Sequence, residues 1–315
     1  MIQLPRNVTT SILALLTAFA APAFAGDTTV MSDKQPTMQQ AAQEANTQNL
    51  LYLDSNYDFA SGFHKGNFGA QAATDSTVEI GHRFLLNSSA WPNEGGQWFF
   101  RLGATYNRSD FSSTRAPTPD VLQNFNGEVA LEYMVDNNQA LFIQSHPGFY
   151  FSKHVTASAF DMPTDIAGGF TIIHDKVYGF LGITGSILRT STPVLPIGGI
   201  LWNIDPKWVL RAIVPQPRLI YNATSNLALW TGGELSGGSY KTDGNSELTP
   251  ERLSGAIVNY YEVRAGGGVT YNLKPVTIEA ASGWVFERDF DYPRADLNYS
   301  TRGAPYIRLS AHLDF

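Results

Sequence analysis

The last ten residues of the chain alternate between apolar and polar side chains. Counting back from the end in steps of two places on one face Ile307, Leu309, Ala311, Leu313 and Phe315. Because successive side chains of a β-strand point to opposite faces, this pattern predicts a strand with one apolar and one polar face. Such a strand could close a membrane barrel or edge a soluble sheet, and alternation alone does not separate the two.

The first 25 residues have the organisation of a secretory signal. Arg6 precedes an apolar run over 12–21, and the segment ends in Ala23-Phe24-Ala25, a small-x-small pattern. We therefore predict export and cleavage near Ala25. A membrane-anchor helix is the alternative, but the run is too short and Pro22 interrupts it.

Composition narrows the class further. The chain has no cysteine, so its fold does not depend on disulfides. Its formal net charge is −7, and it becomes −8 when the signal is removed with Arg6, which argues against nucleic acid as a partner. The six histidines show no metal-ligand spacing, so the sequence predicts no metal and no cofactor. No later run is long enough for a spanning helix.

From residue 50 onward, segments of about ten residues alternate in the same way, which is the length that a tilted membrane strand needs. The clearest are 51–59, 78–84, 98–107, 125–133, 260–271 and 276–287. A mean hydropathy of −0.14 fits such strands, because lipid meets only one of their faces. The 14 Tyr, 19 Phe and 6 Trp suit aromatic girdles. We predict an all-β fold, a transmembrane antiparallel up-and-down β-barrel.

The connections alternate between short and long. The short ones are 136–138, 174–176, 205–207, 223–225 and 273–275, and the long ones are 60–75, 109–122, 153–163, 241–253 and 289–303. Outer-membrane barrels place their short turns in the periplasm and their long loops outside the cell, and an even number of strands returns both chain ends to the periplasm. The count is about fourteen strands, with twelve as the alternative and thirteen disfavoured. The predicted division is a signal peptide over 1–25, a polar periplasmic leader or lumen plug over 26–49, and the barrel over 50–315.

One region departs from the alternation. Residues 177–202 are apolar on both faces, which indicates either packing against an inward-folded segment or an apolar lining for a hydrophobic solute. Nearby, Pro215 and Pro217 cannot donate ladder hydrogen bonds. They either cap a short hairpin at the outer rim or mark a sheltered interruption of the wall. The second arrangement would give apolar solutes a side exit.

The runs 194–210 and 215–221, with their spaced Pro, Trp and Tyr residues, resemble a family of porin-like bacterial outer-membrane β-barrels known only as a domain of unknown function. The alternation ending on Phe315 is likewise similar to the C-terminal assembly signal of outer-membrane barrels. The resemblance implies the barrel fold and the bacterial outer membrane, reached through the periplasm. It assigns no functional residues.

These features favour a passive channel for small solutes, including apolar ones, over a plugged structural or adhesion barrel. The expected partners are outer-membrane lipid, the barrel-assembly machinery and a small-molecule solute; the oligomeric state is not predicted. The charged positions expected to line the pore are Glu79, Arg83, Arg101, Glu128, Glu132, Arg211, Glu262, Arg264, Glu279 and Arg308.

A lipid-modifying enzyme is the alternative from another class, since such enzymes place a Ser and a His on the outer wall. His82 is the mid-strand histidine on the predicted lipid face. Ser145 and His146 are adjacent in sequence and must point to opposite faces, so they cannot act as a dyad. We therefore predict that the protein is not an enzyme and has no catalytic residues.

Overall fold

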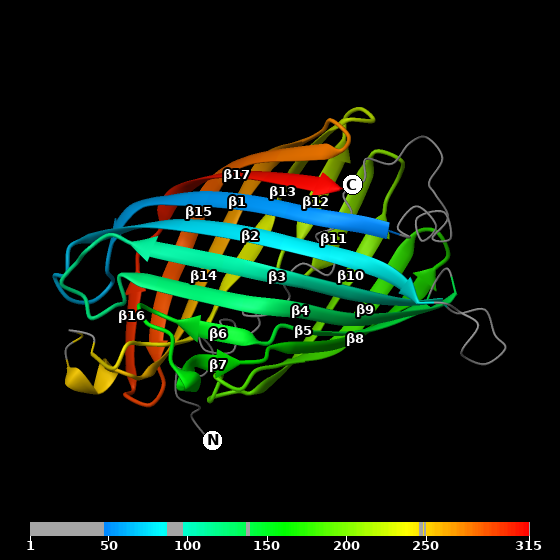
Figure 1. Cartoon of the computed structure of the whole chain (residues 1–315). Helices are drawn as coiled ribbons and strands as arrows, with labels where there is room; N and C mark the ends of the chain where they lie inside the picture. Colours follow the sequence, from blue (N-terminus) through cyan, green and yellow to red (C-terminus); the bar gives the residue numbers. More distant parts are fainter. Residues whose placement is uncertain (1–46, 87–96, 137–138, 246–247, 249, 315) are drawn as a thin grey trace, which may run out of the picture.

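The computed structural model describes residues 47–86, 97–136, 139–245, 248 and 250–314, and these form one sheet that closes on itself (Figure 1). The predicted signal peptide, the leader up to residue 46 and the terminal Phe315 lie outside the described residues. The first strand begins at Thr47, three residues before the predicted start of the barrel.

Fourteen strands of the described chain make the wall. They are β1 (Thr47–Gly62), β2 (Ala70–Leu86), β3 (Gln97–Phe111), β4 (Val121–Asp136), β5 (Gln139–Ser145), β8 (Thr164–Ile173), β9 (Val177–Gly185), β10 (Val194–Asn203), β11 (Trp208–Ile213), β12 (Arg218–Asn222), β13 (Leu227–Lys241), β14 (Ile257–Asn272), β15 (Val276–Tyr292) and β17 (Ala304–Asp314). Each pairs antiparallel with the next, and β17 pairs with β1 to close the ring. The predicted fourteen-strand up-and-down barrel is confirmed.

The connections lie as the sequence predicts. The short turns after β8, β10, β12 and β14 fall at one end of the barrel. Strand β1 begins and β17 ends at this same end, where Leu50 pairs with Asp314. Side-chain acceptors stabilise these turns: Asp205 Oδ1 accepts from the backbone N–H groups of Lys207 at 2.7 Å and Trp208 at 2.9 Å. The long connections gather at the opposite end, which we call the outer end.

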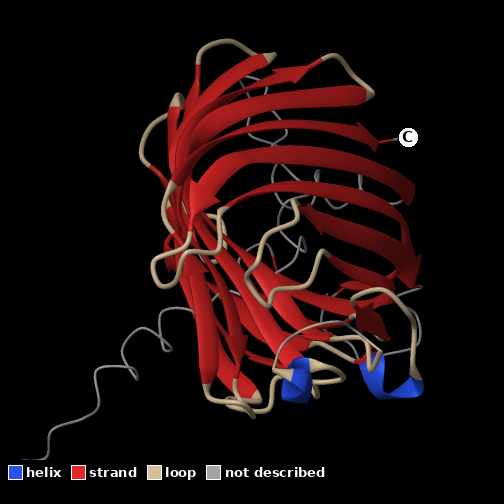
Figure 2. Ribbon diagram, turned by 90° about the vertical axis from the view of Figure 1, so that its left-hand side faces the viewer, coloured by secondary structure: helices blue, strands red, loops and turns tan. Residues whose placement is uncertain are grey.

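Three further strands lie at the outer end: β6 (Gly148–Phe151), β7 (Phe160–Asp161) and β16 (Leu297–Thr301). Two one-turn 3₁₀ segments, Ala157–Ala159 and Glu251–Leu253, lie beside them (Figure 2). Among the described residues, no helix is long and apolar enough to cross a membrane.

Strand β6 gives the barrel two different circumferences. It pairs antiparallel with β4 and meets β13 in one parallel pair, Phe151 with Lys241. The backbone N–H of Ser152 also donates to the carbonyl of Lys241 at 3.0 Å. At this level the ring therefore runs from β4 through β6 to β13 and bypasses β5 and β8 to β12. The outer end is a narrower ring than the rest of the wall.

Large apolar side chains remain exposed all around the outside of the wall. Examples are Ile80, Leu102, Phe125, Leu181, Phe286 and Leu309, each more than two-fifths exposed. The buried polar side chains instead face inward, among them Asn56, Glu128, Gln144 and Glu262. This arrangement is the reverse of a soluble β-sandwich, and the exposed apolar surface is far more extensive than a soluble monomer carries.

Candidate functional site

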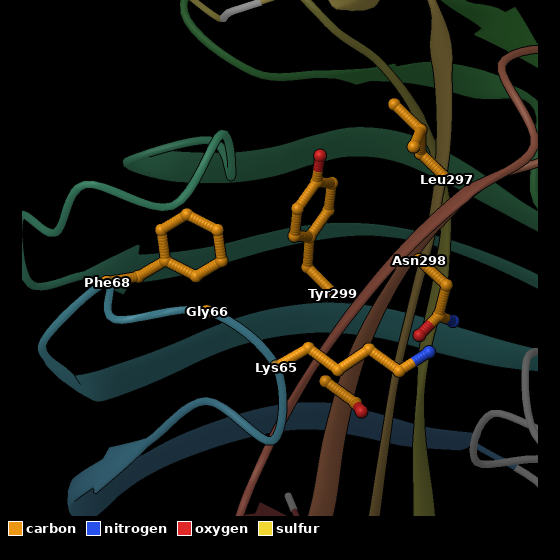
Figure 3. Close-up of a pocket in the computed structure, with 7 residues that line it drawn as sticks. Lys65, Gly66, Phe68, Leu297, Asn298 and Tyr299 are labelled. Atoms are coloured by element: carbon orange, nitrogen blue, oxygen red, sulfur yellow. The ribbon is translucent and has the colours of Figure 1, made fainter.

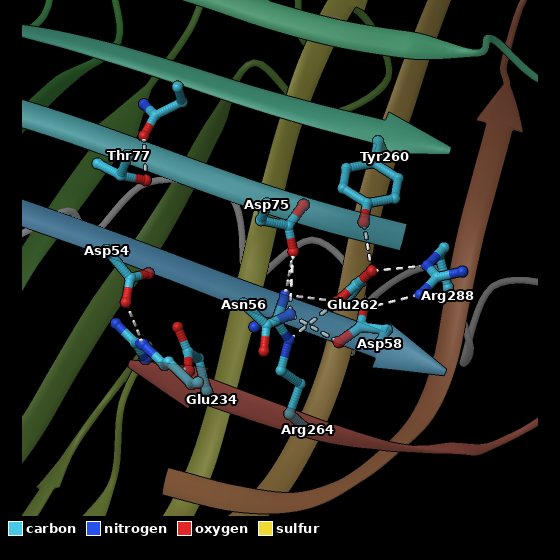
Figure 4. A network of polar contacts seen from close by, with 12 residues as sticks. Asp54, Asn56, Asp58, Asp75, Thr77, Glu234, Tyr260, Glu262, Arg264 and Arg288 are labelled. Atoms are coloured by element: carbon cyan, nitrogen blue, oxygen red, sulfur yellow. Dashed lines mark hydrogen bonds and ion pairs between the residues drawn. The ribbon is translucent and has the colours of Figure 1, made fainter. Parts of the chain in front are cut away.

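The interior of the barrel carries its charged side chains in a few buried clusters. The largest joins Glu262 and Arg264 of β14 to Arg288 of β15, Asp58 of β1 and Asp75 of β2 (Figure 4). Arg264 Nη2 bonds Asp75 at 2.8 Å and Glu262 at 2.6 Å. Arg288 bonds Glu262 through Nε and Asp58 through Nη2, both at 2.7 Å. Two guanidinium groups thus tie together four strands.

Three of these carboxylates could in principle hold a metal ion, because oxygens of Asp58, Asp75 and Glu262 lie within 4.8 Å of one another. Arg264 and Arg288 already bind all three carboxylates, and the amide of Asn56 donates to Asp58 at 2.6 Å. Cations of the protein therefore occupy the place that a metal would take, and the cluster is structural in character.

Arg308 of β17 forms a second cluster. Its guanidinium donates to Asp54 at 2.7 Å, to Glu234 at 2.8 Å and to the Tyr52 hydroxyl at 2.8 Å. Glu234 also accepts from Gln216 Nε2 at 3.1 Å. This contact links the cluster to the turn between β11 and β12.

A third cluster lies on β12, β13 and β15. Arg218 makes a bidentate pair with Glu279 at 2.8 and 3.0 Å, and its guanidinium stacks 3.8 Å from the ring centroid of Trp230. Arg211 of β11 lies directly opposite Arg218 in the ladder. The planar guanidinium suits this combination of a carboxylate fork and an aromatic face.

The fourth cluster lies on β2, β3 and β4. Glu132 binds both Arg83 and Arg101, the latter at 3.0 Å, and Arg101 also approaches Glu128 at 3.5 Å. Glu79, on the same face of β2, is 3 % exposed, and its Oε1 has no hydrogen-bond partner among the described residues. All four clusters sit on the inner face of the sheet.

Eight of the ten predicted pore-lining residues take part in these ion pairs, and Glu79 and Arg211 are the other two. Sequence reasoning missed the partners Asp54, Asp58, Asp75, Arg218, Glu234 and Arg288. The alternation of β1 did mark Asp54 and Asp58 as inward positions. Arg288 was hidden, because a bulge opposite Val263 and Arg264 shifts the alternation of β15.

The outer part of the interior is filled. Above the Glu262 cluster lies a buried aromatic and aliphatic core that includes Phe111, Tyr150, Tyr240, Phe290 and Tyr292. The rings of Phe111 and Phe290 meet edge to face at 5.1 Å. These side chains come from β3, β6, β13 and β15 and meet across the interior at its outer end.

The wall opposite these charges is apolar on both faces, as predicted. On β9 and β10, Leu181 and Ile200 face outward, while Phe180, Leu195 and Ile197 face inward. Further inward-facing apolar side chains follow on the next strands, namely Val209, Ile213, Ile220 and Trp230. The inner face of β9 and β10 is therefore mainly apolar, while β11 and β12 carry the inward-facing Arg211 and Arg218 beside their apolar side chains.

The prolines lie in the turn of a hairpin, which is the first of the two predicted alternatives. The hairpin is short, however: β11 has 6 residues and β12 has 5, against 15 in the neighbouring β13. Two more backbone hydrogen bonds continue the pairing of the hairpin with β13. The N–H of Gly233 donates to the carbonyl of Pro217, and the N–H of Leu235 donates to the carbonyl of Pro215, both at 2.9 Å.

Beyond these contacts the hydrogen-bonded ladder is interrupted. From Ser236 to Tyr240, β13 has no described strand on this side, and its next partner is Phe151 at Lys241. On the other side of the interruption, β10 loses its β11 partner beyond Gly199. Both prolines are half-buried. The hairpin turn thus borders an interruption of the ladder between β10 and β13, which we call the notch, and the side exit stays a prediction.

The histidines do not assemble a catalytic group in the described residues. His82 faces outward and its Nδ1 lies 2.7 Å from Asn49 Oδ1, but its ladder partner is Leu102 and its ring neighbour is Phe84. The hydroxyl of Ser145 contacts Thr164 at 3.0 Å, whereas His146 is buried.

A separate pocket of about 200 Å³ lies at the outer rim, between the connection after β1 and strand β16 (Figure 3). Lys65, Phe68, Leu297 and Tyr299 line it, and the rings of Phe68 and Tyr299 meet edge to face at 6.0 Å. Leu297 and Tyr299 also pack against the buried aromatic core.

Comparison with known proteins finds similarity to solved structures at low sequence identity. No family model matches, and no curated protein matches. A deletion mutant of the TodX monoaromatic hydrocarbon channel is 8 % identical, with a TM-score of 0.43 over 95 % of this chain and 96 % of the other. The COG4313 outer-membrane channel of Pseudomonas putida F1 is 8 % identical, with a TM-score of 0.43 over 85 % and 95 %. A FadL homologue of Pseudomonas aeruginosa is 10 % identical, with a TM-score of 0.41 over 85 % and 90 %.

Proposed function

We propose that this protein is an outer-membrane channel that carries small solutes passively, apolar ones among them. The observation that carries the proposal is the notch above the β11–β12 hairpin, which adjoins the mainly apolar inner face of β9 and β10. The exposed apolar surface around the wall supports the membrane setting. Outer-membrane lipid and a small-molecule solute are the partners that follow from this arrangement.

The route for an apolar solute is lateral. The outer end of the interior is filled by the aromatic core and the Glu262 cluster. A tilted membrane strand needs about 9–11 residues, so β11 and β12, with 6 and 5, are too short to cover the whole apolar layer. A solute that dissolves in the outer leaflet can therefore exchange with the apolar wall through the notch, without crossing the Glu262 cluster.

Export and assembly complete the proposal. The segment 1–25 directs the chain to the periplasm, and Phe315 serves as the signal for the barrel-assembly machinery. The resemblance over 194–221 to a barrel family of unknown function belongs to the same proposal. Deleting Phe315 should lower the yield of heat-modifiable, folded barrel in the outer membrane, and an unchanged yield would remove this residue from the proposal.

The decisive experiment measures uptake into liposomes that contain the purified barrel. An apolar fluorescent probe and a polar sugar of similar size are compared for the native chain, Ile197→Trp and Ile200→Trp. Ile197 faces the interior of β10 beside the notch, and Ile200 faces outward on the same strand. We expect Ile197→Trp to slow the apolar probe several-fold and Ile200→Trp to leave it unchanged.

Three results would count against the proposal. Equal slowing of both probes by Ile197→Trp would exclude a separate apolar route. Uptake no faster than in empty liposomes, together with no conductance in planar bilayers, would favour a structural or adhesion barrel. Release of fatty acid from phospholipid, lost in His82→Ala, would favour the lipid-modifying enzyme, because His82 and Asn49 pair on the outer face.

A further inference from the structure

The fourth cluster holds buried oxygen atoms that nothing in the described protein satisfies. Glu79, Glu128 and Gln144 are 3 %, 1 % and 0 % exposed, and one oxygen of each lacks a hydrogen-bond partner: Oε1 of Glu79, Oε2 of Glu128 and Oε1 of Gln144. Buried acceptors of this kind are rare, because leaving a charged one unpaired costs free energy. The three lie on β2, β4 and β5, and a donor or cation among them would satisfy them.

The register puts these side chains on the same inner face of the sheet, on β2, β4 and β5. Glu128 pairs with Gly103 of β3, and Gly103 pairs with Gly81 of β2, two residues along from Glu79. A Cβ added to Gly103 would lie 2.9 Å from Glu128 Oε2, so this carboxylate lies over the glycine. Glu128 exerts the largest charge effect on Glu79. Gln144 donates through Nε2 to Glu128 Oε1 at 3.0 Å.

The charges of the cluster do not balance. Glu79, Glu128 and Glu132 are three carboxylates, and Arg83 and Arg101 are the two guanidinium groups that face them. His312 also acts on Glu79, and when this imidazole is neutral one negative charge is left. Beyond Gln144, Asp165 is opposed by Arg189 and does not change this balance. The cluster also contains one buried donor without a partner, Arg83 Nε, but Arg83 is already bound to Glu132.

We propose that Glu79, Glu128 and Gln144 bind one primary ammonium group on the inner face of β2, β4 and β5. A primary ammonium carries a single positive charge and three N–H donors, which matches the one missing charge and the three free acceptors. The site goes beyond the proposed passage of apolar solutes, since it recognises a charged head group.

The test is binding to the purified native barrel in detergent, by calorimetry at about pH 8, where histidines are neutral and alkylamines stay protonated. The probes are methylammonium, tetramethylammonium and K⁺. Methylammonium should bind most tightly, because the other two have no N–H groups to donate. Glu79→Gln should weaken methylammonium about tenfold or more, since it removes a charge-assisted hydrogen bond. Asp175→Asn makes the same change in net charge in an exposed turn and should have no effect.

Gln144→Met keeps every charge of the cluster and removes one acceptor, so it should reduce the preference for methylammonium over K⁺. Heat modifiability of each variant verifies that the barrel is folded. Equal binding of K⁺ and methylammonium would overturn ammonium recognition, and so would binding that survives Glu79→Gln. No binding of any cation would also overturn it and would leave water or a proton as the occupant. Because binding is measured without transport, failure here leaves the channel proposal standing.

Discussion

The two sides of this barrel stabilise themselves by opposite means. Strands β1–β4 and β13–β15 have 15 to 17 residues, and their inward faces are held by buried arginine–carboxylate pairs and, at the outer end, by an aromatic core. Strands β9–β12 have 5 to 10 residues and present apolar side chains both to the outside and to the interior. Ion pairs hold the long side, and apolar packing dominates on the short side, where Arg218 of β12 pairs with Glu279 of β15.

The difference teaches where an opening can form. Breaking one partner of a buried ion pair leaves an uncompensated charge, so the long side has few accessible alternatives to its closed form. Apolar contacts have no preferred direction, so the short side can admit an apolar guest in place of a neighbour. At the outer end, β6 pairs with β4 and with β13. The ring can therefore close there without the strands of the short side.

The largest expected effect comes from breaking the long side at Arg288. The variant Arg288→Met leaves Glu262 and Asp58 buried without their guanidinium, which should reduce the free energy of unfolding by about 3–5 kcal/mol. Urea titration of the barrel refolded in lipid measures the change. The exposed Arg302 supplies the control, and Arg302→Met should be nearly neutral. A loss at Arg288 no larger than at Arg302 would mean that the ion pairs do not hold this side together.

The short side should instead be sensitive to charge on its lipid face. Leu181 is 66 % exposed on the outside of β9, and Leu181→Arg should cost about 2–4 kcal/mol if it lies near the middle of the apolar layer. Ile197→Arg places the same charge on the inner face of the adjacent β10 and should cost less. Refolding titrations of the two variants give the comparison, and equal costs would show that the faces of this wall are wrongly assigned.

The positive φ of Gly237 in β13, beside the notch, should matter at an intermediate level. Gly237 has φ of +140°, and an added Cβ would meet the Tyr260 carbonyl oxygen at 2.1 Å, so Gly237→Ala should destabilise by about 1–3 kcal/mol. Gly62, at the end of β1, has no heavy atom within 4 Å of such a Cβ, and Gly62→Ala is the matched control. Similar stability of the two variants would show that β13 relaxes freely at the notch.

The smallest expected effect is that of low pH on the stability of the contact between β6 and β13, which we call the outer seam. The backbone N–H of Asn245 and the side chain of His154 lower the pKa of Asp243 from its ordinary 3.8. A lowered pKa stabilises the folded seam at pH values above 3.8, and this contribution is lost as the pH falls through the folded value. Hydrogen exchange at Ser152, whose Oγ accepts from the Asp243 N–H at 2.9 Å, should accelerate in acid. Asp243→Asn should abolish that acid dependence, and its persistence would assign it to another group.

Much of this architecture could be predicted from the sequence, because a membrane strand alternates with a period of 2 and every turn needs its own residues. The alternation ending at Leu313 gave the inward and outward faces, and turn residues such as Asp205 gave the connections and the even strand count. The two-sided apolar character of β9 and β10 was also visible, since both faces of a strand are local properties.

The partners of the charges depended on the tertiary structure. Arg308 and Asp54 are 254 residues apart, and Arg288 and Asp58 are 230 apart, so only closure of the ring brings them together. A bulge decided that Arg288 faces inward, and bulges have no period to reveal them. The bridge from β6 to β13, the filled outer end and the notch arise in the same way, because they depend on where strands of unequal length end against one another. Local alternation therefore determined the faces of this barrel, and long-range closure determined which side chains meet within it.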